Sequence, residues 1–477
     1  MKLSRISTNF FGKLGTQFLP FADAASAELP LGRLMRLSLF QISVGIAIVL
    51  LNGTLNRVMI VELGTPAWLV AMMIAIPLLV APFRALIGHK SDNHQSMLGW
   101  RRVPYIWFGS LIQFGGLAIM PFALVLLSRP DTFTVGLVAG LLAFLLTGLG
   151  MHTTQTAGLA LATDLAQDES RPRVVALLFV MQLVGIMLAA LVMGSLLADF
   201  SATRLVSIVQ GAAMLTMGLN IVALWKQEAR RPSTTTPNRV IPKFSVVWRE
   251  FTGEARNARL LLAIGCGTAA FSMQDVLLEP FGGEILGMSV GATTLLTGLW
   301  AFGMLLGFGW AARRLGHGAD PLRLAGFGAA IGMAAFAMLL FAAPLESIGL
   351  VFTGALTIGL GAGLFSVGTL SAIMAIAGTG RHSGSGLALG AWGAVQATAA
   401  GVAIALGGLI RDGVSALAVA DQIGATLAYR ATGYGTVYLI EIVLLLVTMI
   451  VLGPLVGDST LDAPAPQSRF GLTEFPT

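Results

Sequence analysis

The sequence is short of charge. Only 11% of its 477 residues are Asp, Glu, Lys or Arg, whereas 56% are hydrophobic. Soluble domains carry roughly 25% charged residues, and a core of this length cannot absorb the difference. The mean hydropathy of +0.83 agrees with this conclusion. The composition therefore excludes a soluble globular protein and predicts a polytopic membrane protein.

Cysteine is almost absent as well. The single Cys266 lies in an apolar run, so neither an intrachain disulfide nor a cysteine-based metal site can form. The basic residues behind the net charge of +6 stand in short loops between apolar runs, which excludes a nucleic-acid partner. No cleavable signal peptide is expected, because the first apolar run begins near Leu37 and is too long for one.

Long apolar runs, by contrast, are abundant. Runs of about 20 apolar residues can cross a bilayer as helices, in which every backbone group is bonded within its own segment. The predicted fold class is therefore an all-α polytopic membrane protein with twelve transmembrane helices. We predict these spans at 37–60, 67–88, 103–127, 134–162, 174–198, 204–225, 259–281, 290–312, 322–343, 349–377, 385–410 and 433–456.

The basic residues predict the orientation of the chain. If the N-terminus is cytoplasmic, nearly all Lys and Arg residues fall on the cytoplasmic side. The opposite side then holds only Arg57, Arg129, Arg204, Arg411 and Arg430. The positive-inside rule thus places both termini in the cytoplasm.

A Pro-, Thr- and Arg-rich segment divides the spans six and six. The predicted organisation is a cytoplasmic N-terminal segment, a first six-helix half, a cytoplasmic linker, a second half and a cytoplasmic tail, at 1–36, 37–225, 226–258, 259–456 and 457–477. Aromatic and aliphatic residues recur at helical spacing within 244–251 and 11–18. They predict short helices on the membrane surface, with flexible loops as the alternative.

The two halves resemble each other weakly in sequence. TGLG of span four aligns with IGLG of span ten, which places His152 opposite Gly363. GTLNRVMIVEL of span one aligns with DVLLEPFGGEI of span seven, which places Arg57 opposite Glu279. Repeated halves related by an axis along the membrane normal are a transporter architecture.

The loop between spans two and three, GHKSDNHQSMLGWRRVPYI, adds a second signal. Gly88, Asp92, Gly99, Arg101 and Arg102 resemble the cytoplasmic signature of the major facilitator superfamily. In that signature an Asp at a helix end and basic loop residues form a charge network, which we expect of Asp92, Arg101 and Arg102. The spacing here is stretched, and the second half (GWAARRLGHGADPLR) lacks the matching Asp.

A polar cluster is predicted near the outer ends of spans one and seven. It comprises Asn56, Arg57, Gln274, Asp275 and Glu279. An ionisable group at the centre of a span costs about 2.5–3.5 kcal/mol, so such groups usually face the bundle interior. We expect Arg57 to pair with Glu279 or with Asp275 and to close the outer side. The alternative is that these side chains reach the outer interface separately.

Span four carries a second polar cluster, in TGLGMHTTQTAGLALATDLA. Gly148, His152 and Gln155 share one helix face, and His152 lies about 18 Å along the helix from Asp164 at the cytoplasmic end. This face predicts either close helix packing or a ligand site at the midplane. Glu441 of span twelve also has two interpretations: a protonated carboxyl bonded to a neighbour, or a lipid-side group near the headgroups.

Four long stretches together resemble the PucC/LhaA family, the bacteriochlorophyll delivery branch of the major facilitator superfamily. They are LNRVMIVEL, WRRVPYIW, HTTQTAGLALATDLA and MQDVLLEPFGGEILG, and the resemblance covers about 34–455. It implies a non-enzymatic assembly factor for light-harvesting complexes that binds bacteriochlorophyll or delivers it to antenna polypeptides. It also implies the cytoplasmic or intracytoplasmic photosynthetic membrane as the location. Bacteriochlorophyll synthase, the insertion machinery and membrane lipids are the further partners implied.

The resemblance gives the span-four cluster a specific interpretation. The magnesium of bacteriochlorophyll has an open axial position that a neutral imidazole can fill, and His152 is the only histidine deep in a span. Gln155 would bond a ring carbonyl or a water ligand, and Gly148 would leave room. Alternatively the pigment, a carotenoid or a lipid binds the lipid-facing surface. Two other functions stay open: a secondary transporter, with Asp275 or Glu279 as the proton-coupling carboxylate, and a pigment-free scaffold.

Overall fold

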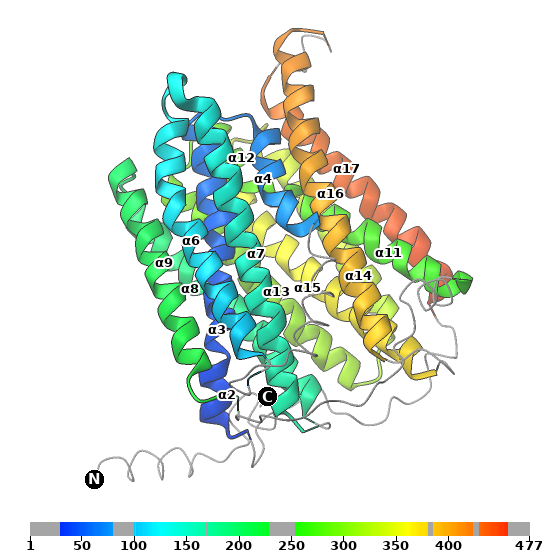
Figure 1. Ribbon diagram of the computed structural model, residues 1–477. Coiled ribbons are helices and arrows are strands. Elements are labelled where there is room, and N and C mark those ends of the chain that lie inside the picture. The colour runs from blue at the N-terminus through cyan, green and yellow to red at the C-terminus, as the bar shows by residue number, and fades with distance from the viewer. Residues whose placement is uncertain are drawn as a thin grey trace.

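The computed structural model describes residues 29–79, 100, 102–167, 170–228, 253–379, 385–422 and 429–456. The regular elements in these ranges are helices packed into one bundle (Figure 1). Eleven helical stretches in them are long and apolar enough to cross a membrane, and the predicted second span begins with a shorter apolar helix. The rest of that span and both predicted surface helices lie outside the described residues, as do Asp92 and Arg101.

The first half begins with an irregular span. Span one runs through α2 (Leu31–Leu37), α3 (Leu39–Ile48) and two π-helical segments, η3 (Val49–Leu55) and η4 (Val58–Glu62). It is followed by α4 (Ala67–Leu79), α6 (Val103–Leu127), the short η6 (Pro130–Thr132), α7 (Phe133–Leu165), α8 (Arg171–Leu196) and α9 (Ala202–Leu224).

The second half begins with an irregular span as well. Span seven consists of α11 (Ala255–Ser272), the 3₁₀ segment η7 (Met273–Val276) and α12 (Leu278–Glu284). It is followed by α13 (Val290–Gly316), α14 (Pro321–Ala342), α15 (Ile348–Thr379), α16 (Ser385–Val419), α17 (Ala431–Leu452) and η9 (Gly453–Leu455).

Glycine lets the two halves approach each other closely. Gly194 of α8 lies against Gly291 of α13, and Gly408 of α16 lies against Ala71 of α4. A Cβ at any of the three glycines would meet backbone of the facing helix. Small residues generally allow helices to approach closely in membrane bundles. Close packing matters there because the hydrophobic effect does not drive helix association within lipid. The pairs α4–α16 and α8–α13 are thus the main helix contacts between the halves.

Glycines aligned by the internal repeat make equivalent contacts. Gly150 of α7 packs on the backbone of Gln113 in α6, and Gly361 of α15 packs on the backbone of Gly328 in α14. Spans three and four in one half therefore pack as spans nine and ten do in the other. This agreement supports the predicted relation between the halves. It also shows that the glycine run of span ten serves helix packing.

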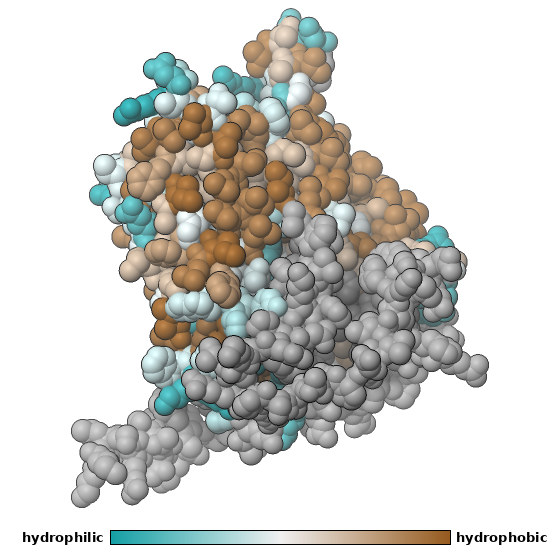
Figure 2. Space-filling model, in the orientation of Figure 1, coloured by the Kyte–Doolittle hydropathy of each residue, from teal (hydrophilic) through white to brown (hydrophobic). Residues whose placement is uncertain are grey.

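The outside of the bundle is apolar, as a membrane-spanning chain requires. Figure 2 shows a broad band of hydrophobic side chains over the helices, with hydrophilic residues at the upper ends. Large apolar side chains stand exposed on this surface, among them Phe108, Phe122, Met214 and Phe341. A soluble monomer rarely exposes apolar patches of this extent, so the surface is suited to face lipid.

Candidate functional site

Spans one and seven lose α-helical geometry in the segments that the repeat alignment pairs. Span one is π-helical from Val49 to Leu55, and span seven narrows to a 3₁₀ turn from Met273 to Val276. Interrupted helices at corresponding places in two halves are the strongest sequence-level indication of a transporter binding site, and π turns are frequent at functional sites. We therefore take this pair of breaks as the candidate functional site.

The two breaks touch each other. The Asn56 side-chain amide donates a hydrogen bond to the Val276 carbonyl oxygen at 2.9 Å. That carbonyl belongs to the 3₁₀ turn, where α-helical bonding of the backbone is interrupted. Asn56 itself is fully buried. A side chain of the first half thus satisfies a backbone group that the irregular geometry of the second half exposes.

Helix α13 completes the contact from the other side. The Thr54 and Thr294 hydroxyls lie 3.2 Å apart and are both fully buried. The Thr297 hydroxyl donates a hydrogen bond to Glu279 Oε1 at 2.5 Å, and this carboxylate lies against Gly53. The site therefore joins span one to spans seven and eight through a small set of buried polar groups.

The structure corrects the predicted pairing of Arg57. Among the described residues, Arg57 makes its ion pair with Glu62 and not with Glu279 or Asp275, and it donates a second hydrogen bond to the Met288 carbonyl oxygen at 3.1 Å. The reason is the π geometry, which brings the residue five positions later alongside. Arg57 still attracts the Glu279 carboxylate electrostatically. Of the predicted cluster, Asn56, Arg57 and Glu279 therefore lie at the contact between spans one and seven, whereas Gln274 and Asp275 bond each other in η7.

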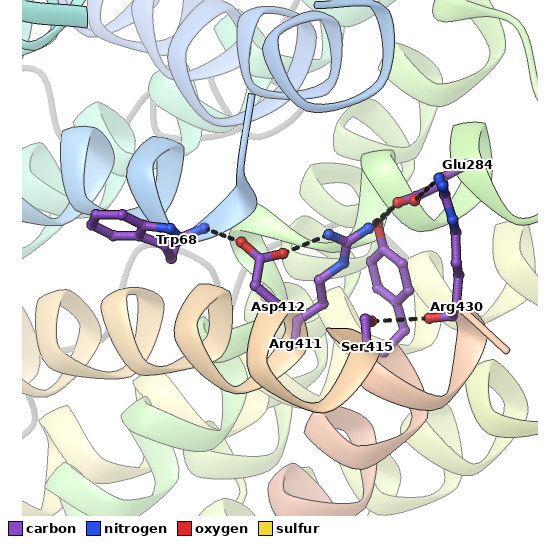
Figure 3. Close-up of polar contacts among 7 residues, drawn as sticks. Trp68, Glu284, Arg411, Asp412, Ser415 and Arg430 are labelled. Carbon is purple, nitrogen blue, oxygen red and sulfur yellow. Dashed lines mark hydrogen bonds and ion pairs between the residues drawn. The ribbon is translucent and has the colours of Figure 1, made fainter. Parts of the chain in front are cut away.

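A second polar network, which we call the outer network, joins α12, α16, α17 and α4 (Figure 3). Its centre is Glu284, which forms ion pairs with Arg411 and with Arg430, the latter at 3.2 Å. Tyr434 donates a further hydrogen bond to Glu284 at 2.7 Å. The Arg411 side chain is 10% exposed, so this cation is largely removed from solvent and held by several partners.

The outer network also ties the two halves together. Arg411 pairs with Asp412 at 2.6 Å, and the other Asp412 oxygen accepts the backbone N–H of Trp68 at 2.8 Å. Trp68 lies in the first turn of α4, where backbone N–H groups have no helical partner and favour a negative charge. Asp412 and its neighbours therefore link α4 of the first half to α16 and α12 of the second half.

The outer network was only partly predictable from the sequence. Arg411 and Arg430 stood out merely as basic residues on the outer side, and Tyr434 not at all. One signal was available: Glu62 and Glu284 occupy equivalent places in the aligned segments of spans one and seven. In the structure both carboxylates pair with arginine, so the repeat places an arginine-binding glutamate in each half.

The opposite end of the first half carries part of the predicted cytoplasmic charge network. Arg102 Nε bonds Asp164 Oδ2 at 3.1 Å and links the start of α6 to the end of α7. The Glu228 carboxylate accepts the backbone N–H groups of Arg102 and Val103 at 3.1 and 3.0 Å. A carboxylate there complements the positive end of the helix dipole. Of the predicted network, only Arg102 lies within the described residues.

The face of span four that carries His152 is occupied by neighbouring helices. Gly148 is covered by Pro77 of α4. Gln155 donates to Gln182 of α8 at 2.9 Å and approaches Gln41 of α3 at 3.4 Å. His152 itself is 8% exposed. In this packing the face does not fit a macrocycle, and Gly148 and Gln155 serve the helix packing that was the first of the two predicted interpretations.

Comparison with solved structures identifies the fold. A bacterial homologue of the human lysosomal transporter Spinster, in an inward-facing and occupied conformation, matches with a TM-score of 0.68 at 14% identity, over 91% of this chain and 98% of that one. Such low identity shows the fold alone. It confirms the predicted fold class, the transporter fold of the major facilitator superfamily.

Comparison with known families agrees with the sequence motifs. The family model described as PUCC protein matches residues 54–460. Protein PucC of Rhodovulum sulfidophilum is 54% identical over 421 residues, which cover 87% of this chain and 92% of that one. The bacteriochlorophyll synthase 44.5 kDa chain of Rhodobacter capsulatus is 30% identical over 396 residues, 81% of this chain and 87% of that one. The chain is therefore a multi-pass membrane protein that belongs to the PUCC family.

Proposed function

We propose that this protein is a non-enzymatic assembly factor for bacterial light-harvesting complexes, and that it binds bacteriochlorophyll or delivers it to antenna polypeptides in the photosynthetic membrane. The observation that carries the proposal is the near full-length similarity to protein PucC. The similarity to a chain named for bacteriochlorophyll synthase supports the choice of pigment. Both termini are proposed to be cytoplasmic, on the charge bias of the loops.

The packing of α4 indicates how pigment could reach His152. One face of α4 covers Gly148 through Pro77, while Ala71 and Trp68 hold the helix against α16 of the second half. Helix α4 therefore makes two contacts: it packs on Gly148 of α7, and it packs on α16 of the second half. Pigment would reach this face only in a different packing of α4 on α7, and His152 would then be the residue to bind it.

The proposal is tested by purification from a pigmented host in mild detergent. We expect a near-infrared bacteriochlorophyll absorption that elutes with the protein, together with antenna polypeptides. A colourless protein that elutes with antenna polypeptides would support a pigment-free scaffold instead. A colourless protein without them, which catalyses solute counterflow in vesicles, would establish the transporter alternative.

A further inference from the structure

Span twelve buries a carboxyl group that the outer network does not use. Glu441 of α17 is 0% exposed, and so is Tyr438 one turn earlier on the same face. Within the described residues, neither Glu441 oxygen has a hydrogen-bond partner, and the Tyr438 hydroxyl has none either. Of the two interpretations from the sequence, the lipid-side position is excluded, because Glu441 lies inside the bundle.

The break in span seven faces these two side chains. Gln274 of η7 donates its amide to Asp275 Oδ1 at 2.6 Å, and its own amide oxygen is buried without a partner in the described structure. Glu441 lies close to the Gln274 backbone and interacts electrostatically with Asp275. Phe281 holds the elements together, since its ring meets that of Tyr438 edge-on with centroids 5.5 Å apart. Two carboxyl groups and a phenol therefore converge on one turn.

Such an arrangement is unfavourable for two negative charges. An isolated ionised carboxylate in an apolar interior costs far more than its neutral acid, and two neighbouring carboxyl groups avoid double ionisation by retaining a proton. A neutral acid also adds an O–H donor to that of Tyr438, beside the unpartnered amide oxygen of Gln274. Asp275 is less deeply buried than Glu441.

The surrounding elements bring few other ionisable groups to this place. On α12, Glu279 is held by Thr297, and Glu284 belongs to the outer network together with Arg411 and Asp412 of α16. Helix α4 has no ionisable residue. The other ionisable residues on helices that pack against η7 or α17 are Tyr434 on α17, Cys266, Arg256 and Arg259 on α11, and Arg323 at the start of α14. The described residues contain no group of three or more His, Cys, Asp or Glu suited to a metal ion.

We propose that Asp275, Glu441 and Tyr438 form a proton-binding site in the second half, in which Glu441 carries the proton and Asp275 exchanges it with water. Loading the site forms one carboxyl O–H bond with a proton taken from water, and no electrons are transferred. On loading, the Tyr438 hydroxyl, which has no partner in the described structure, becomes a hydrogen-bond partner for the acid. The site is independent of pigment binding, so it can be present whether or not the proposed assembly function holds.

Infrared spectroscopy of the detergent-purified protein tests this site directly. At neutral pH we expect a carbonyl band of a protonated carboxylic acid that shifts in heavy water. The band should be lost in Glu441→Gln and keep its intensity but change its frequency in Tyr438→Phe. Asp275→Asn should slow its exchange in heavy water several-fold. The matched control is Glu254→Gln, an exposed residue at the start of α11, which should leave the band unchanged.

Two results would overturn the proposal. A band that persists unchanged in Glu441→Gln shows that another group carries the proton. A wild-type protein that is stabilised against heat by sodium chloride but not by choline chloride, with the effect lost in Asp275→Asn, shows a metal-cation site instead. If Glu441→Gln does not fold, the frequency change in Tyr438→Phe decides, because an unchanged frequency in that variant contradicts the site equally.

Discussion

Gly53 of span one lies directly against the carboxylate of Glu279 in span seven. A Cβ at position 53 would overlap Glu279 Oε1 and stand 3.0 Å from the Thr297 hydroxyl. The contact lies between the two interrupted helices and involves groups from both halves. The closeness of the halves at the candidate site therefore depends on a residue without a side chain.

Replacing this glycine should weaken the contact. Gly53→Ala pushes the Glu279 carboxylate away from span one. Because this carboxylate ends a flexible side chain, we expect a cost near the lower end of the range of about 1–3 kcal/mol typical of overpacking. We expect a lower thermal unfolding temperature for the purified protein in detergent. Gly211→Ala is the matched control, because a Cβ at Gly211 meets nothing within 4 Å. Equal unfolding temperatures for both variants would show that the contact contributes little.

The partner of Arg57 can be determined by double-mutant cycles. Arg57→Gln combined with Glu62→Gln should show a coupling free energy of about 1 kcal/mol, within the range found for residues in direct contact. Arg57→Gln combined with Glu279→Gln should show a smaller coupling, since that pair interacts at longer range. Thermal unfolding of the single and double variants measures both. A larger coupling to Glu279 would restore the pairing predicted from sequence.

The outer network should depend on one arginine much more than on the other. Arg411→Gln leaves the partly buried Glu284 and Asp412 without their shared cation, so the cost should approach the value of about 3–5 kcal/mol found when a buried pair loses one partner. Arg430 bonds the same Glu284, but its side chain is 71% exposed, so Arg430→Gln should cost about 0–1 kcal/mol. Thermal unfolding compares the two. Similar losses would contradict the central place of Arg411.

The pigment prediction depends on a single imidazole. His152→Ala should lower the ratio of near-infrared absorption to protein in material purified from a pigmented host. His317→Ala is the control, because His317 is an exposed histidine beyond α13. Unchanged pigment content in His152→Ala would remove this residue as the axial ligand and favour binding on the lipid-facing surface.

Hydropathy predicted twelve spans, and eleven of them are long apolar helices in the described residues. α6 covers 103–127 as expected, and α14 differs from its predicted range by one residue at each end. Agreement is weaker where helices continue past the apolar run, as α16 does to Val419 and span one does from Leu31. The length of an apolar run reflects the thickness of the hydrocarbon core of the membrane. The helix itself can extend beyond that core, because its hydrogen bonds do not require apolar side chains.

The details of the site were harder to predict for a physical reason. The breaks at η3 and η7 are changes in backbone hydrogen bonding. The apolar residues of these segments do not differ from those of a regular span, so the hydropathy pattern does not reveal the breaks. Sequence therefore placed Asn56, Arg57 and Glu279 in one cluster but assigned Arg57 the wrong partner. Asp412 and Glu284 were missed as network members because residues near helix ends resemble ordinary loop residues.

The π segments of span one also determine the direction in which the side chains of the following residues point around the helix axis. A π turn accommodates an extra residue, and each residue of an α-helix turns the chain by about 100°. Asn56 and Arg57 consequently face span seven, with Glu62 behind them. Deleting one residue from Val49–Leu55 would straighten the helix and swing these side chains toward a different neighbour. The direction of these side chains thus depends on the number of residues in the π segment. A substitution does not change that number, so no single substitution can reproduce the effect of a deletion.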